Sequence, residues 1–232
     1  SGLGLAERPK AVHTPQAAAA VGQMGLIHAW EAALNRHRIT TAQVLLTHDD
    51  VGHRHRYLNA RNALRELLRF GVVPVVNEND TVAVDEIRLG DNDRLGAMTA
   101  GLVEADVLVI LTDQQGLYTA DPRVDAAATL IAHAEIHDPR LADMAGDSKG
   151  VLGRGGMKTK LQAAQMAARS GTATLIAYGH ADGILQAARD GADVGTLLTP
   201  GRDAAGLPAR KRWIADQLQR RGSLRLDAGA TE

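Results

Sequence analysis

Two kinds of apolar pattern alternate along most of the chain. Apolar residues at helical spacing predict helices over residues 17–35, 57–71, 94–105 and 158–171. Short continuous apolar runs predict strands over residues 42–47, 72–77, 106–113 and 172–179. Continuous rather than alternating apolar strands, separated by helices, indicate a sheet that is covered on both faces. The pattern therefore predicts the α/β class, with an open and mainly parallel sheet.

Composition narrows the classes of protein that fit this pattern. Of the 232 residues, 45% are hydrophobic and only 3% aromatic, so a sizeable core must be built from Ala, Val, Leu and Ile. The formal net charge of −1 gives no general attraction to nucleic acid or to an anionic membrane. The sequence contains no cysteine, which excludes disulfides and thiolate chemistry and fits a cytoplasmic location. No apolar run approaches the roughly 18 residues of a membrane span.

The segment from Val75 to Asp93, VVNENDTVAVDEIRLGDND, concentrates negative charge in a chain that is otherwise near neutral. Its charged residues are six acids, Glu78, Asp80, Asp85, Glu86, Asp91 and Asp93, and one base, Arg88. A solvated acidic loop and a site for a metal ion or an ammonium group are both open readings. Ligands of open α/β sheets bind at the carboxyl ends of the strands, and this segment follows an apolar run. That placement favours a site.

A second segment, GVLGRGGMKTK from Gly150 to Lys160, has four glycines in seven residues and leads into a predicted helix. Glycine-rich turns expose backbone N–H groups, and a helix N-terminus adds positive potential, so an anion is favoured there. The alternative is a flexible surface loop. The segment is not a Walker A loop, because Met157 separates Gly156 from Lys158. A phosphate site of another family is therefore the prediction.

A third segment, LTDQQGLYTADPR from Leu111 to Arg123, begins where a predicted buried strand ends. As structure alone it is a strand followed by two turns. As function, a threonine hydroxyl, an aspartate and an exposed tyrosine at a strand end can hold a nucleotide.

The three segments, in this order, resemble those of the glutamate 5-kinases of the amino acid kinase family. AAVGQ, YLNARNAL and VGTLLTP followed by RKRW add to the match, which covers nearly the whole chain. Aspartate and uridylate kinases share the strand ending in Thr-Asp and the Gly-Tyr-Thr-x-Asp-Pro pattern. The pair of segments NEND and GDND is what favours the glutamate enzymes.

The resemblance implies the amino acid kinase fold, an α/β/α sandwich. It implies ATP-dependent phosphorylation of the side-chain carboxylate of L-glutamate to glutamyl 5-phosphate, the first step of proline biosynthesis. Mg²⁺, feedback inhibition by proline and a homo-oligomer are implied with it. The alternatives are another kinase of the family, acting on aspartate, N-acetylglutamate or uridylate, and a non-catalytic fragment.

The resemblance also implies roles for particular residues. Lys160 matches the lysine that stabilises the transferring phosphoryl group, and Asp93 matches the aspartate that organises the phosphate-binding lysines. Asp80 and Asn92 match substrate-binding positions, where a carboxylate suits the α-ammonium group of glutamate. The nucleotide-binding positions implied are Thr112, Asp113, Arg154, Gly155, Gly156, Met157, Lys158, Thr159 and Lys160. The acids also suit Mg²⁺, which prefers oxygen ligands, but the sequence assigns no particular one to the metal.

The chain departs from the family at its ends. The family begins with a strand that ends in a Lys-x-Gly-Ser/Thr loop, and nothing in this sequence matches it. We therefore expect residues 1–200 to be an amino acid kinase domain that lacks its N-terminal strand and loop. Residues 201–232 are expected to be a linker and the start of a truncated PUA-like domain. Arg154 stands where a small residue is more usual in the family.

Overall fold

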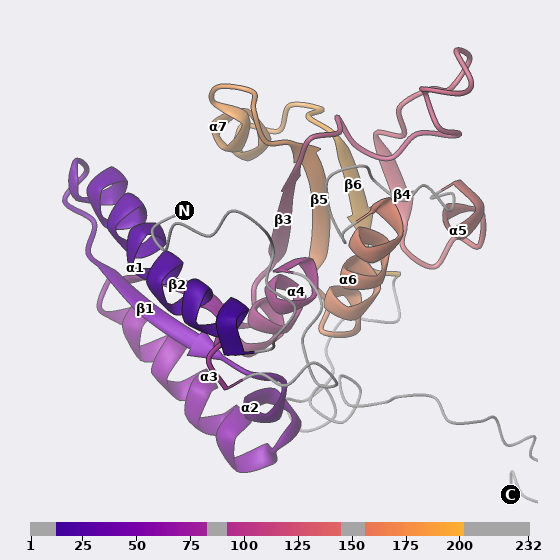
Figure 1. Ribbon diagram of the computed structural model, residues 1–232. Helices are drawn as coiled ribbons and strands as arrows, with labels where there is room; N and C mark the ends of the chain where they lie inside the picture. The colour runs from indigo at the N-terminus through magenta and orange to yellow at the C-terminus, as the bar shows by residue number, and fades with distance from the viewer. Residues whose placement is uncertain (1–12, 83–91, 145–155, 202–232) are drawn as a thin grey trace, which may run out of the picture.

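The computed structural model describes residues 13–82, 92–144 and 156–201, in which helices are interspersed with strands (Figure 1). The helices are α1 (His13–Asn35), α2 (His48–Gly52), α3 (Arg54–Arg69), α4 (Asn92–Val103), α5 (Arg140–Met144), α6 (Met157–Arg169) and α7 (Ile184–Arg189). The strands are β1 (Thr41–Leu46), β2 (Val73–Glu78), β3 (Val107–Thr112), β4 (His133–Glu135), β5 (Ala173–Tyr178) and β6 (Thr196–Thr199). All eight predicted elements are confirmed. The five short elements α2, α5, α7, β4 and β6 were not predicted.

The described strands form two sheets instead of one. β1 and β2 pair in parallel, and the second sheet has the order β3-β5-β6-β4. Among the described strands, β5 and β6 pair antiparallel and the other pairs are parallel, so the prediction of a mainly parallel α/β structure is confirmed.

A cavity of about 370 Å³ lies where the sheet is interrupted. Pro74 and Val76 of β2, Val107 and Val109 of β3, and residues of α4 line it. Pro74 has no amide hydrogen to donate, which suits the edge of a sheet better than its centre.

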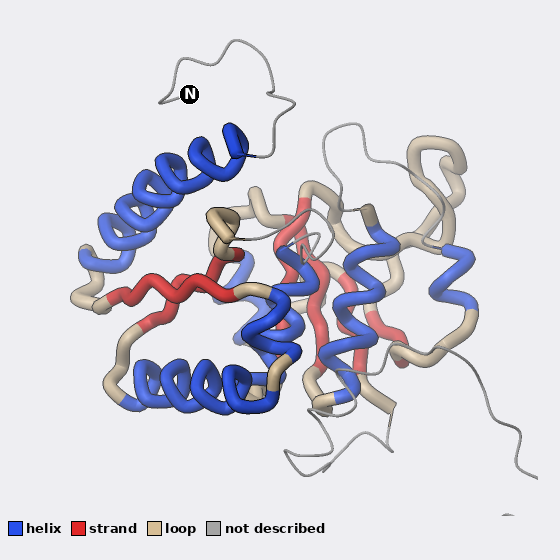
Figure 2. Tube along the Cα trace, turned by 60° about the horizontal axis from the view of Figure 1, so that its bottom comes forward, coloured by secondary structure: helices blue, strands red, loops and turns tan. Residues whose placement is uncertain are grey.

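Helices cover both faces of the β1–β2 sheet. α1 lies on one face and α3 on the other, as Figures 1 and 2 both show. Leu64 of α3 is fully buried, whereas Leu68, one turn further along the same helix, is 46% exposed. The apolar repeat of α1 is also largely uncovered: Met24 is 57% exposed and Trp30 49% exposed. Helical spacing identified these helices correctly but did not reveal which side chains are covered.

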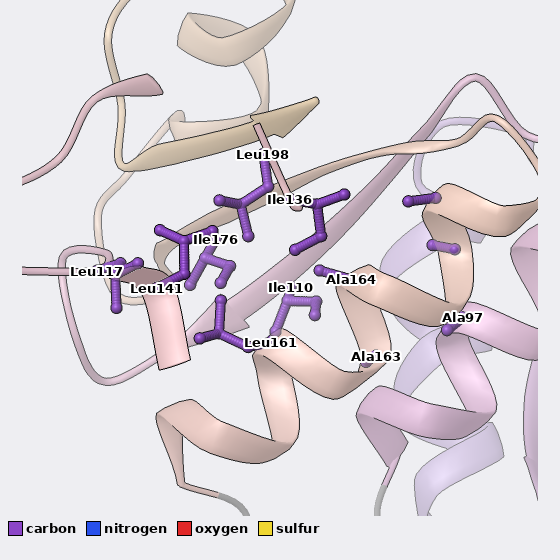
Figure 3. Packing of buried hydrophobic residues seen from close by; sticks show 12 residues of the cluster. Ala97, Ile110, Leu117, Ile136, Leu141, Leu161, Ala163, Ala164, Ile176 and Leu198 are labelled. Carbon is purple, nitrogen blue, oxygen red and sulfur yellow. The ribbon is translucent and has the colours of Figure 1, made fainter. Parts of the chain in front are cut away.

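Two buried clusters meet at α4. Leu95, Met98 and Leu102 belong to a cluster under β1 and β2, together with Leu46 and Leu64. Ala97 belongs to a second cluster, which joins α6 to the β3-β5-β6-β4 sheet (Figure 3). The α6 residues of that cluster include Ala163, Ala164, Ala167 and Ala168. Such small side chains allow α4 and α6 to pack closely, which brings their first turns together.

Candidate functional site

The first turns of α4 and α6 are joined by an ion pair. Lys160 Nζ donates to Asp93 Oδ2 at 2.8 Å, across 67 positions of sequence. The two side chains are only 12% and 16% exposed. A charge pair so withdrawn from water interacts more strongly than a surface pair, and each partner depends on the other for neutralisation.

The end of the glycine-rich segment determines where α6 begins, and so where Lys160 lies. Gly156 is the N-cap of α6, with φ −88° and ψ −178°, and no side chain caps the helix there. Thr159 Oγ1 donates to the carbonyl oxygen of Gly156 at 2.8 Å, which fixes the first turn. A lysine in the first turn faces the positive end of its own helix, so it does not stabilise that helix. Its position is better explained by what its ammonium group contacts.

The end of β3 lies beside the start of α6. Leu161, which follows Lys160, packs in one buried cluster with Ile110 and Leu117 (Figure 3). Those two residues lie on either side of Thr112 and Asp113 in the sequence. The packing therefore brings the predicted nucleotide-binding pair to the same edge as the ion pair.

Two hydrogen bonds hold the chain at the end of β3. Thr112 Oγ1 donates to Asp113 Oδ1 at 3.1 Å. The amide of Gly179, just after β5, donates to the carbonyl oxygen of Thr112 at 2.8 Å. Thr112 is half-buried and Asp113 is exposed, so the pair presents a hydroxyl and a carboxylate at the rim of the sheet.

The loop after β3 depends on Thr196, which sequence reasoning did not single out. Thr196 is fully buried, and its Oγ1 accepts from the Leu117 amide at 2.8 Å. The same hydroxyl donates to the carbonyl oxygen of Ile131 at 2.6 Å. Its neighbour Gly195 has φ +105°, and an added Cβ would lie 2.1 Å from the carbonyl oxygen of Ile176. The Gly-Thr pair before a short apolar run was the available signal.

An exposed ion pair borders the same loop. Arg123 donates to both carboxylate oxygens of Asp121, at 3.0 and 2.7 Å. These side-chain hydrogen bonds, with a further one from the Arg123 amide, lower the pKa of the Asp121 carboxyl to about 2. Hydrogen bonding to Asp121 raises the pKa of Arg123, and the nearby charge of Asp113 adds to that effect.

The two predicted substrate-binding residues lie in different places. Asp80, just beyond β2, lines a cavity of about 160 Å³ between β1, β2 and α1. Asn92, the exposed first residue of α4, lines the cavity between the two sheets. Asn92 is adjacent to Asp93 and hence to the ion pair, and the cavity that it lines differs from the one that Asp80 lines.

Several predicted residues fall outside the described part of the chain. These are Arg154 and Gly155 of the glycine-rich segment and Asp85, Glu86 and Asp91 of the acidic segment. Gly156, Met157, Lys158 and Thr159 are described, and all lie at the start of α6. Their assignment to a nucleotide stays a prediction.

Comparison with known proteins shows the family of the chain. A family model described as the amino acid kinase family matches residues 3–178 of the chain. The chain belongs to the amino acid kinase family. A lysine that is held by an ion pair, beside a strand end that carries Thr and Asp, is an arrangement able to bind and neutralise phosphate oxygens.

Named relatives are much longer than this chain. It is 57% identical over 232 residues to a glutamate 5-kinase of Pseudomonas paraeruginosa, of which it spans 62%. It is 60% identical over 230 residues to a glutamate 5-kinase of Chromohalobacter salexigens, of which it spans 60%. The crystal structure of UMP kinase from Ureaplasma parvum shares the fold, with a TM-score of 0.51 and 16% identity, covering 74% of this chain and 65% of that one.

Two further observations concern metal-binding groups and membrane-spanning helices among the described residues. In residues 13–82, 92–144 and 156–201, no group of three or more His, Asp or Glu side chains is arranged to bind a metal ion. Within the same ranges, no helix has both the length and the apolar character needed to cross a membrane.

Proposed function

We propose that this kinase domain transfers the γ-phosphoryl group of ATP to the side-chain carboxylate of L-glutamate, giving glutamyl 5-phosphate for proline biosynthesis. The observation that carries the proposal is the Lys160–Asp93 pair, held at 2.8 Å where two helices begin beside the end of β3. The glutamate 5-kinases at 57% and 60% identity support glutamate as the acceptor.

Lys160 is given the role of neutralising charge on the transferring group. Phosphoryl transfer depends mainly on positioning and on charge stabilisation, so one well-placed ammonium group matters. Asp93 holds the Lys160 side chain in one direction through the 2.8 Å contact. An attacking carboxylate oxygen of glutamate would bond to the γ-phosphorus while the bond to the ADP oxygen breaks, and the acyl phosphate forms without loss of a proton.

The other assignments are built around that pair. Thr112 and Asp113 would contact the nucleotide, together with the start of α6 from Gly156 to Thr159. Asp80 would accept from the α-ammonium group of glutamate, and Asn92 would contact substrate from beside Asp93. The predicted contacts of Arg154 and Gly155 are part of the same proposal.

Mg²⁺ enters the proposal with the nucleotide. The ion usually keeps several waters and is bound by substrate phosphates and one or two carboxylates, so a dedicated protein cage is not required. When bound, Mg²⁺ would supply positive charge that neutralises the phosphate oxygens.

Self-association and proline inhibition complete the proposal. Val21, Met24, Leu26 and Trp30 of α1 are each at least 40% exposed, and such apolar exposure along one helix favours a homo-oligomer. Light scattering measures the oligomer, and an excess of proline in the assay measures inhibition. A cytoplasmic location remains a proposal that rests on the absence of cysteine.

The activity is tested by supplying MgATP with L-glutamate, L-aspartate, N-acetylglutamate or UMP. ADP release is followed, and acyl phosphate is trapped with hydroxylamine. We expect hydroxamate only with glutamate, and Lys160→Ala should lower turnover by about 10²–10³-fold. Preference for another acceptor would assign the chain to a different kinase of the family. ATP binding without any turnover would favour a non-catalytic role.

A further inference from the structure

The cavity beside Asp80 combines negative charge with one buried amide. It lies between α1 and the carboxyl ends of β1 and β2, and its volume is about 160 Å³. Glu78 and Asp80 line it from the strand end and Gln23 lines it from α1. A cavity of this size accommodates several heavy atoms of a small ligand rather than a nucleotide. Two acids there favour the cationic end of an amino acid.

Gln23 is hydrogen-bonded through only one end of its amide. Asn77 Nδ2 donates to Gln23 Oε1 at 2.7 Å, linking β2 to α1 across 54 positions of sequence. The Nε2 group of Gln23 is buried, and no partner for it is found in the described chain. A buried donor without an acceptor is costly, by roughly 1–3 kcal/mol, and native proteins rarely keep one without a reason.

The other polar side chains of the cavity are less suited to bind an anionic group. Gln43 is exposed, so water already satisfies it. The Thr81 hydroxyl donates to Asn79 Oδ1. Glu78 and Asp80, when ionised, accept hydrogen bonds and repel a carboxylate. Gln23 therefore provides a buried neutral donor in this cavity.

We propose that Gln23 Nε2 donates to the α-carboxylate of the amino acid substrate, and that Asn77 orients the amide for this contact. The inference rests on the proposed function, because it takes an amino acid whose α-ammonium group meets Asp80. The ammonium and carboxylate groups share one carbon atom, so a ligand that reaches Asp80 also brings its carboxylate to the same cavity. Gln23 would then select for amino acids with a free α-carboxylate.

The test uses the full-length protein with Gln23→Met, Gln23→Glu and a control, Gln165→Glu, at an exposed position of α6. Affinity for L-glutamate and for its α-carboxamide analogue is measured by calorimetry, and KM and kcat for both are measured by hydroxamate formation. Gln23→Met should weaken glutamate binding about ten- to a hundredfold, the usual cost of losing a hydrogen bond to a charged group. The KM for ATP and the behaviour of Gln165→Glu should stay as in the wild type.

The two analogues separate a carboxylate contact from a packing role. The α-carboxamide offers an N–H₂ group, so Gln23→Glu should reverse the wild-type preference and favour the analogue by at least about tenfold. An unchanged ratio of the two affinities in both variants would overturn the inference. So would a lower melting temperature with unchanged affinity, because the amide would then serve packing alone.

The affinities also separate this inference from the proposed function. Wild-type protein that binds glutamate but yields no hydroxamate would contradict the proposed function, while the Gln23 variants would still decide the inference from affinities alone. If the wild type turns over glutamate and Gln23→Met keeps its affinity, only the inference fails. Absence of amino-acid binding to the wild type would overturn both.

Discussion

Breaking the Lys160–Asp93 pair should destabilise the fold as well as stop the chemistry. Lys160→Met leaves the Asp93 carboxylate without its partner in a site where the two side chains are 12% and 16% exposed. Removing one member of a buried pair typically costs about 3–5 kcal/mol, and the remaining exposure places this pair near the lower figure. Asp93→Asn should cost a similar amount by leaving the ammonium group unneutralised.

The double variant Lys160→Met/Asp93→Asn removes both charges at once. We expect it to be more stable than the sum of the single variants predicts, by about 2–3 kcal/mol, because no charge is left unpaired. Urea unfolding followed by circular dichroism measures each free energy of unfolding. Turnover should not recover with stability, since the double variant still lacks the ammonium group.

A matched cycle on an exposed pair provides the control. Arg69 Nη2 lies 2.6 Å from Glu66 Oε1, but these side chains are 64% and 53% exposed. The cycle of Arg69→Met and Glu66→Gln should give a coupling much smaller than that of the Lys160–Asp93 cycle, because water screens exposed charges. If the Lys160–Asp93 cycle were additive within about 0.5 kcal/mol, the two groups would not depend on each other and the reasoning would be refuted.

Three other predictions concern the loop after β3 and its surroundings. Thr196→Val should lower the free energy of unfolding by about 2–4 kcal/mol, because the buried Leu117 amide loses its acceptor, whereas Thr196→Ser should cost less; equal losses in urea unfolding would contradict this. Gly195→Ala should cost more than about 3 kcal/mol, since φ is +105° and the added methyl would meet a backbone carbonyl; a melting temperature equal to the wild type would refute the contact. Asp121, whose titration is followed by NMR, should titrate near pH 2, and in Arg123→Gln its pKa should move toward the ordinary value of 3.8. Because the pKa of Asp121 in the folded state is lowered, the stabilisation from this ion pair is complete above about pH 4 and is lost as the pH falls through 2. An unshifted titration would contradict the ion pair.

The sequence revealed the elements that local pattern can encode. The apolar runs predicted strands over residues 106–113 and 172–179, and the structure forms β3 and β5 there, pairing Thr112 with Tyr178. The glycine-rich segment predicted that a helix begins just before Lys160. These features depend on residues close together in the chain, which is why periodicity and turn composition were sufficient.

Contacts between distant segments could not be predicted from the local sequence pattern alone. The hydrogen bond from the Leu117 amide to Thr196 spans 79 positions, and Gln23 meets Asn77 across 54. The Lys160–Asp93 pair was anticipated only through a resemblance, because nothing in either segment indicates the other. The short strands β4 and β6 were missed because three or four residues carry no reliable period.

Exposure was the other property that sequence could not provide. The apolar repeat on α1 has the spacing of a buried face, yet Trp30 is 49% exposed. Spacing shows which residues share a face of a helix, but not whether another element covers that face. For the same reason, the sequence did not show that the sheet is interrupted between β2 and β3. Both strands have the apolar pattern of buried strands, yet residues of both line a cavity.

The decisive measurement follows oxygen atoms from glutamate into phosphate. L-Glutamate labelled with ¹⁸O in its side-chain carboxylate is incubated with the protein and MgATP. An acyl phosphate formed there cyclises when the α-amino nitrogen attacks the side-chain carbonyl carbon, and it releases phosphate that retains the bridging oxygen. Phosphorus NMR should then show phosphate with one ¹⁸O atom, formed by wild-type protein and hardly at all by Lys160→Ala. Phosphate without label would mean that ATP is cleaved by water or that another group is the acceptor, and it would contradict the proposed reaction.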